Sequence, residues 1–182
     1  NVAYFLSKMG KRTLIIDFDP QGNATSGLGI DKQELGATMT EVIMRQTRLA
    51  KVVLPTEYKD LYLAPSTSHL ANTEVELAQA DARFARLREA LNGVIDYDYI
   101  IIDSPPSLSL LTVNGLVAAD YVLLPVQAEF YALEGLGQLL ESMKLIRKGL
   151  NPSLKLLGVL PTMMDSRTTL SSQVYDEIKK YF

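Results

Sequence analysis

Three aspartates follow two strongly apolar segments of the chain. Residues 14–16 (Leu-Ile-Ile) lead into Asp17 and Asp19, and residues 99–102 (Tyr-Ile-Ile-Ile) lead into Asp103. If both segments are parallel strands, these acids gather at the carboxyl edge of one sheet, where open α/β sheets bind ligands. Carboxylates gathered there repel one another unless a cation lies among them. Mg²⁺ takes one or two protein carboxylates together with water and phosphate oxygens. The acids therefore predict a magnesium–phosphate ligand.

Each aspartate also has a purely structural interpretation. An Asp after a strand commonly forms a turn or caps a helix. Asp103 precedes Ser-Pro-Pro and could simply cap the next helix. The spacing of Asp17 and Asp19 favours a site, because residues two apart in an extended segment point to the same side. On spacing alone, both interpretations stay open.

The segments that must position these acids alternate between two patterns. Nearly continuous runs of Val, Ile and Leu predict buried parallel strands at Thr13–Phe18, Tyr99–Ile102, Tyr121–Val126 and Leu156–Pro161, with a weaker one at Leu61–Ala64. Helical patterns cover Val2–Met9 (ending at Gly10), Leu70–Leu91 with a break near Ala80–Asp81, Ser107–Ala118, Ala132–Lys148 and Ser172–Phe182. The alternation predicts one α/β domain over residues 1–182, with helices on both faces of a mostly parallel sheet.

Composition excludes several classes of protein. The 182 residues are 47% hydrophobic and 21% charged, which is typical of a globular chain. No apolar run is long enough to span a bilayer. The absence of cysteine excludes disulfides and thiolate zinc sites, and the single histidine, His69, leaves little scope for a catalytic triad. A net charge of −3 gives no overall attraction to nucleic acid.

Several stretches together resemble the ParA/Soj family of deviant Walker ATPases, which partition bacterial chromosomes and plasmids. They are residues 14–29 (LIIDFDPQGNATSGLG), 97–120 (YDYIIIDSPPSLSLLTVNGLVAAD), 125–135 (PVQAEFYALEG) and 162–182 (TMMDSRTTLSSQVYDEIKKYF). The DPQGN run is the most specific part. The resemblance implies a doubly wound sheet of the P-loop NTPase type, close to MinD and incomplete at both ends of this chain.

The resemblance also implies roles for individual residues. Asp19 matches the aspartate that positions the attacking water, and Asp17 lies near the phosphates and Mg²⁺. Asp103 matches the Walker B carboxylate that holds Mg²⁺ through water. The residues implied to bind ATP or ADP are Asp17, Pro20, Gln21, Gly22, Asn23, Thr162 and Met163. The segments 19–27 and 103–107 are implied to act as switches that the γ-phosphate orders.

One feature departs from the family. The phosphate-binding motif G-x-x-x-x-G-K-[ST], which supplies a backbone N–H cradle and a lysine, does not occur in these residues. We therefore expect the chain to be an internal fragment of a longer protein. We also expect the 182 residues alone neither to bind nor to hydrolyse ATP appreciably.

For the complete protein the resemblance implies an ATP-driven homodimer that is cytoplasmic and nucleoid-associated. It would bind non-specific duplex DNA, and a ParB-like partner would stimulate hydrolysis. Six basic residues near the end of the chain (Lys144, Arg147, Lys148, Lys155, Lys179 and Lys180) fit either DNA contacts or solvated helix faces. Two other functions stay open: a MinD-like positioning ATPase, and a non-catalytic signalling module of the receiver type.

Overall fold

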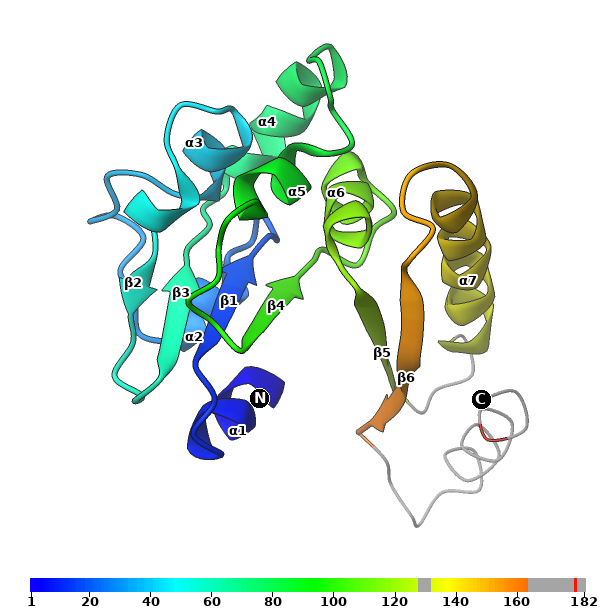
Figure 1. The fold of residues 1–182 in the computed structure, drawn as a ribbon, viewed down its shortest axis with the longest axis horizontal. Helices are drawn as coiled ribbons and strands as arrows, with labels where there is room; N and C mark the ends of the chain where they lie inside the picture. Colours follow the sequence, from blue (N-terminus) through cyan, green and yellow to red (C-terminus); the bar gives the residue numbers. More distant parts are fainter. Residues whose placement is uncertain (128–131, 164–178, 180–182) are drawn as a thin grey trace. The chain divides into compact units, whose positions relative to one another are not determined.

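The structure is a computed structural model that describes residues 1–127, 132–163 and 179 (Figure 1). Its internal contacts divide the chain into two compact units, Asn1–Ala118 and Ala119–Phe182. The expected single domain over residues 1–182 stays a prediction.

The first unit contains a four-stranded sheet in the order β2-β3-β1-β4. Its strands are β1 (Thr13–Asp17), β2 (Leu54–Pro55), β3 (Leu61–Ala64) and β4 (Tyr99–Asp103). The central strand β1 runs parallel to both β3 and β4, whereas β2 pairs antiparallel with β3. The predictions for β1, β3 and β4 are confirmed to within one residue, and the two-residue strand β2 was not predicted.

Short helices connect these strands. They are α1 (Val2–Lys8), α2 (Asn23–Gly27), α3 (Met39–Ile43), the 3₁₀ helix η1 (Leu49–Lys51), α4 (His69–Ala78), α5 (Arg86–Leu91) and α6 (Leu110–Ala118). The predicted break in the segment 70–91 is confirmed, because α4 ends at Ala78 and Ala82 has a left-handed backbone with φ 52°. Helix α6 begins three residues later than predicted. Helices α2 and α3 were not predicted.

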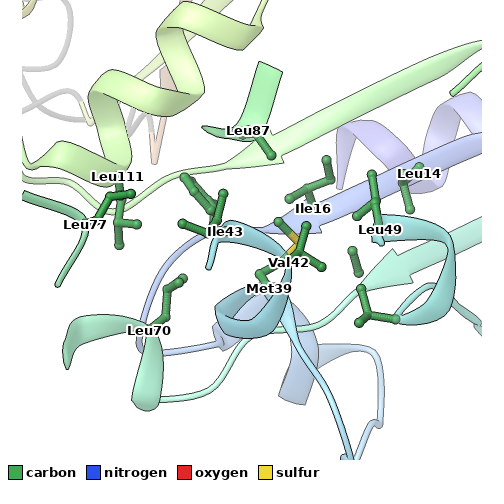
Figure 2. Packing of buried hydrophobic residues seen from close by; sticks show 13 residues of the cluster. Leu14, Ile16, Met39, Val42, Ile43, Leu49, Leu70, Leu77, Leu87 and Leu111 are labelled. Atoms are coloured by element: carbon green, nitrogen blue, oxygen red, sulfur yellow. The ribbon is translucent and has the colours of Figure 1, made fainter. Parts of the chain in front are cut away.

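The core of the first unit lies between β1 and the helices that follow it. Leu14, Ile16 and Phe18 alternate along β1 and its continuation, and all three are fully buried. They belong to one cluster with Met39, Val42 and Ile43 of α3, Leu70 and Leu77 of α4, Leu87 of α5 and Leu111 of α6 (Figure 2). Fully burying one such side chain contributes about 1.5–3 kcal/mol to folding. This packing fixes β1, and with it the position of the acids at its end.

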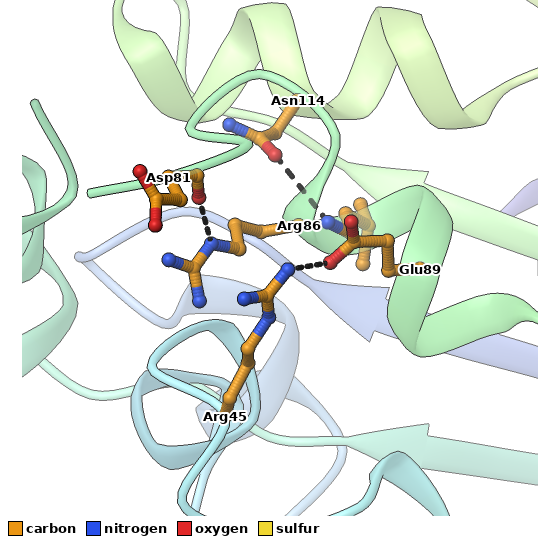
Figure 3. A network of polar contacts seen from close by, with 6 residues as sticks. Arg45, Asp81, Arg86, Glu89 and Asn114 are labelled. Carbon is orange, nitrogen blue, oxygen red and sulfur yellow. Dashed lines mark hydrogen bonds and ion pairs between the residues drawn. The ribbon is translucent and has the colours of Figure 1, made fainter.

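A buried asparagine organises the turn between α4 and α5. The Asn114 side chain donates from Nδ2 to the Arg83 carbonyl at 2.7 Å, and its Oδ1 accepts from the Leu87 N–H at 3.3 Å. In the same region the Arg86 Nε donates to the Asp81 carbonyl at 2.9 Å (Figure 3). The neighbouring Gly115 packs closely on the loop after β4, since a Cβ there would lie 2.9 Å from the Ser104 Oγ. Helix α6 is thus tied both to this turn and to that loop.

The second unit contains a pair of parallel strands and one long helix. Strand β5 (Tyr121–Gln127) pairs with β6 (Lys155–Thr162), and α7 (Ala132–Gly149) lies between them in sequence. Leu139 and Leu140 of α7 pack against the buried side chains of Leu124 and Val126. These two strands and this helix confirm the predictions for residues 121–126, 156–161 and 132–148. The predicted helix over residues 172–182 lies outside the described residues, apart from Lys179.

The predicted α/β class is confirmed, because parallel strands joined through helices occur in both units. In the part of the chain that the structure describes, no helix combines the length and apolar character needed to cross a membrane.

Candidate functional site

The acids predicted from the sequence meet at the carboxyl edge of the first sheet. Asp17 is the last residue of β1 and is paired in register with Asp103, the last residue of the neighbouring β4. The backbone N–H of Phe18 donates to the Asp103 carbonyl at 2.8 Å, so the two strands stay joined beyond their ends. Asp19 follows directly in the loop after β1. The structure therefore brings all three predicted acids to one edge.

Asp17 holds the loop that carries Asp19. It is fully buried, and its Oδ2 accepts hydrogen bonds from the Thr25 N–H at 2.7 Å and the Thr25 hydroxyl at 2.6 Å. Its Oδ1 accepts a longer bond, 3.4 Å, from the Asp19 N–H. The Thr25 oxygen in turn accepts from the Ser66 N–H at 3.0 Å, which connects the loop to the segment after β3. Contact between Asp17 and a metal stays a prediction.

Asp19 begins a tight turn and is partly exposed. Its Oδ1 accepts from the Gln21 N–H at 2.9 Å, and its carbonyl accepts from the Gly22 N–H, also at 2.9 Å. Gly22 has a left-handed backbone with φ 62°, and a Cβ on it would lie 2.7 Å from the Ser66 carbonyl oxygen. Glycine is required at this position for both reasons. No described residue hydrogen-bonds to the Asp19 Oδ2, so this oxygen can receive a ligand.

The predicted loop residues Pro20, Gln21, Gly22 and Asn23 follow Asp19 directly, and helix α2 begins at Asn23. Pro20 and Gln21 also line an open groove together with Lys32, Thr67 and His69. The loop predicted to contact the nucleotide therefore lies beside the acids, and two of its residues line a groove.

Asp103 has a raised pKa, and no residue that the structure describes hydrogen-bonds to its carboxylate. The residue is exposed overall, but neighbouring groups partly desolvate its carboxylate, which is the largest cause because it disfavours the charged form, and the negative charges of Asp17 and Asp19 raise the pKa further. Among the described residues, Asp103 makes no side-chain hydrogen bond or ion pair. Negative charge gathered in this way is what a bound cation neutralises.

The donor set fits Mg²⁺ that also binds phosphate, but not a metal held by protein alone. In the described ranges, no three His, Cys, Asp or Glu side chains are grouped closely enough to enclose a metal ion. Mg²⁺ needs only one or two carboxylates when water and phosphate oxygens complete its coordination. Asp103 supplies one such hard donor, and Asp17, its register partner on β1, is the second predicted one.

The two predicted adenine-contacting residues belong to the second unit. Thr162 is the last residue of β6, and Met163 follows it with a left-handed backbone (φ 51°) and an 80% exposed side chain. Their grouping with the acids of the first unit stays a prediction.

Sequence reasoning missed Thr25, Ser66 and Lys32. Thr25 lies eight residues after Asp17, and Ser66 lies 41 residues after Thr25. Neither spacing matches a helical or strand period, so no local pattern indicates that they meet. Only the path of the loop brings these residues together.

Comparison with known proteins defines first the class and then the family. Residues 1–156 match the family described as "AAA domain". A solved structure of cobyrinic acid a,c-diamide synthase from Mycobacterium smegmatis, with bound ATP analog and magnesium, is similar with a TM-score of 0.93 and 38% identity. That similarity covers 100% of this chain and 74% of the other. The fold is therefore that of the P-loop ATPases.

Two curated relatives match over the whole chain. The chromosome partitioning protein ParA of Myxococcus xanthus is 49% identical over 183 residues, and the sporulation initiation inhibitor protein Soj of Bacillus subtilis is 48% identical over the same length. Both alignments cover 100% of this chain, which spans 65% of the first relative and 72% of the second. The chain belongs to the ParA/Soj family.

Proposed function

We propose that the complete protein is an ATPase that partitions chromosomes or plasmids. The observation that carries this proposal is the edge formed by Asp17, Asp19 and Asp103, where one carboxylate has a raised pKa and another a free oxygen. The chain is 49% and 48% identical, over its whole length, to two relatives named for chromosome partitioning and for inhibition of sporulation initiation, which supports a role in partitioning. The cofactors in this proposal are ATP or ADP and Mg²⁺.

The proposed site divides the work among the three acids. Asp103, through water, would hold Mg²⁺ with Asp17 close by, and the ion supplies charge neutralisation for the phosphates when bound. Asp19 orients the attacking water through the oxygen that the turn leaves free. Asp17 maintains the loop through Thr25. Phosphoryl transfer depends mainly on positioning and electrostatics, so these roles match what the reaction needs.

Six further residues are proposed to contact the nucleotide. Pro20, Gln21, Gly22 and Asn23 approach the phosphates because they form the turn that follows Asp19. Thr162 and Met163 contact the adenine, and this assignment comes from the family resemblance alone.

We also propose a cycle of ATP binding, DNA binding and hydrolysis for the complete protein. ATP closes a homodimer, the dimer binds duplex DNA without sequence preference, and a ParB-like partner stimulates hydrolysis and release. The protein is cytoplasmic and associates with the nucleoid. Family membership supports each step. Binding through phosphates would make the DNA affinity fall steeply with salt.

The proposal is tested in the full-length protein with Asp19→Ala. Loss of a group that positions the attacking water lowers kcat about 100-fold or more, whereas nucleotide binding and ATP-dependent dimerisation survive. Phosphate release and analytical ultracentrifugation measure these two properties. Asp96→Ala is the matched control, because Asp96 is exposed and precedes β4 at its opposite end. Normal turnover in Asp19→Ala would count against the assigned role.

A further inference from the structure

A lysine from outside the predicted motif reaches the turn that begins at Asp19. The Lys32 ammonium donates a hydrogen bond to the Gln21 carbonyl oxygen at 2.6 Å. The lysine stem passes directly over Gly22, where a Cβ would lie 2.7 Å from the Lys32 Cε and 2.8 Å from its Nζ. Gly22 therefore serves two needs: a left-handed backbone and the room for Lys32.

The peptide that Lys32 contacts is central to the turn. Its carbonyl, from Gln21, accepts from Lys32, and its N–H, from Gly22, donates to the Asp19 carbonyl at 2.9 Å. The Gln21 N–H, one peptide earlier, donates to the Asp19 carboxylate, also at 2.9 Å. Fixing the Gln21–Gly22 peptide therefore holds the Gly22 bond to the Asp19 carbonyl directly and the Gln21 bond to the Asp19 carboxylate through the adjoining backbone of Gln21.

The charge of Lys32 has no competing partner in the described part of the chain. No carboxylate there forms an ion pair with its ammonium, since the described ion pairs join Arg45 to Glu89 and Lys144 to Glu141. A hydrogen bond from a charged donor is shorter and stronger than one between neutral groups. Lys32 is only partly buried and lines the open groove with Gln21 and His69, so water reaches this contact.

We propose that Lys32 is a positioning residue for Asp19. It holds the Gln21–Gly22 peptide by its charged hydrogen bond and so keeps the Asp19 carboxylate in the orientation needed for water. This inference rests on the proposed function, in which Asp19 acts on the attacking water. Lys32 itself acts only through the turn.

The test uses three variants of the full-length protein. Lys32→Met keeps a stem of similar length without the charge, Lys32→Arg restores a cation, and Lys59→Met removes an exposed lysine that precedes β3. Steady-state ATP hydrolysis gives kcat and KM. Amide hydrogen exchange of residues 19–27, measured without nucleotide, reports the turn directly and needs no enzymatic activity.

We expect Lys32→Met to lower kcat about tenfold, because the loss of one charged hydrogen bond removes part of the stabilisation of the transition state. KM should change less than about twofold. Exchange over residues 19–27 becomes faster in this variant, and Lys32→Arg recovers most of both properties. Lys59→Met changes neither. A raised KM at unchanged kcat would instead make Lys32 a binding residue and overturn the proposal.

The two proposals fail in different ways. Unchanged exchange and unchanged kcat in Lys32→Met would contradict the role of Lys32 and leave the ATPase assignment intact. Absence of ATP hydrolysis in the unmodified protein would contradict the ATPase assignment, and with it the catalytic consequence drawn for Lys32.

Discussion

At the scale of single residues, Asp17 and Asp103 end neighbouring strands in register but have opposite surroundings. Asp17 is fully buried and its carboxylate accepts three hydrogen bonds, two of them from Thr25. Asp103 has no side-chain partner among the described residues, and its pKa is raised. One acid therefore maintains the loop, whereas the other is available to a ligand.

The Thr25 hydroxyl gives the first prediction at this scale. Thr25→Val removes the hydroxyl that donates to Asp17 and accepts from Ser66, while it keeps the shape of the side chain. We expect a loss of about 1–3 kcal/mol in the free energy of unfolding, because two buried polar groups lose a partner. Thr25→Ser keeps the hydroxyl and costs only about 0.8 kcal/mol for the missing methyl group. Urea denaturation measures both, and equal losses would show that the hydroxyl contributes nothing.

The second prediction concerns pH. The folded chain binds the Asp103 proton more tightly than the unfolded chain does, because burial and two nearby carboxylates raise the pKa. Stability therefore falls as the pH rises from the ordinary Asp pKa through the raised value. Asp103→Asn removes this cost, so we expect the variant to be more stable than the unmodified protein at pH 7.

The gain in stability of Asp103→Asn must shrink as the pH is lowered, because the carboxyl group of Asp103 in the unmodified protein then becomes neutral as well. Urea midpoints at pH 7 and at mildly acidic pH, without Mg²⁺, measure this trend. Asp96→Asn serves as the control, since Asp96 precedes β4 and lies far from the acidic edge. A gain that does not depend on pH would point to a cause other than titration of Asp103.

At the scale of elements, the turn between α4 and α5 depends on a residue of α6. Asn114 is fully buried and bonds the Arg83 and Leu110 carbonyls as well as the Leu87 N–H. We expect Asn114→Ala to lower the free energy of unfolding by about 1–3 kcal/mol, because it leaves these backbone groups without a partner. Thermal or urea unfolding measures the loss. The exposed Asn92 offers a control. A similar loss of stability in Asn92→Ala would show that the buried hydrogen bonds of Asn114 are not the cause.

The elements that could be predicted from the sequence are those with long apolar patterns. Strands β1, β4, β5 and β6 have nearly continuous runs of Val, Ile and Leu, and α7 has a long helical stripe. Helices α2 and α3 have only five residues each, too few for a periodic signal. The capping box of α3, in which Thr38 and Glu41 bond each other's backbone, was a local signal that could have indicated its start.

The same distinction holds for the site. Asp17, Asp19 and Asp103 could be predicted because each lies at or just beyond the end of an apolar strand. Thr25 and Lys32 could not, because their contacts depend on the path of the loop and on the left-handed backbone of Gly22. The acids can therefore be identified from strand patterns alone, whereas the residues that position them can be identified only from the three-dimensional structure.

At the scale of the whole molecule, the 182 residues lack the Walker lysine and its glycine-rich loop. Those groups neutralise and cradle the β- and γ-phosphates in P-loop proteins. We therefore expect residues 1–182 alone to show no appreciable ATP affinity, because the acidic edge without that lysine repels a triphosphate. A titration with labelled ATP and Mg²⁺ tests this expectation. Micromolar affinity would show that the described acids and loop bind nucleotide without the lysine.

The tight approach of Gly115 to Ser104 couples two distant parts of the first unit. A Cβ on residue 115 would lie 2.9 Å from the Ser104 Oγ, so a larger residue there requires the serine side chain to rotate or α6 to shift away from the loop after Asp103. Asn114, its neighbour, would carry any such displacement on to the α4–α5 turn. A larger residue at position 115 would then disturb the α4–α5 turn as well as the loop after Asp103, and a spectroscopic probe on that turn would register it.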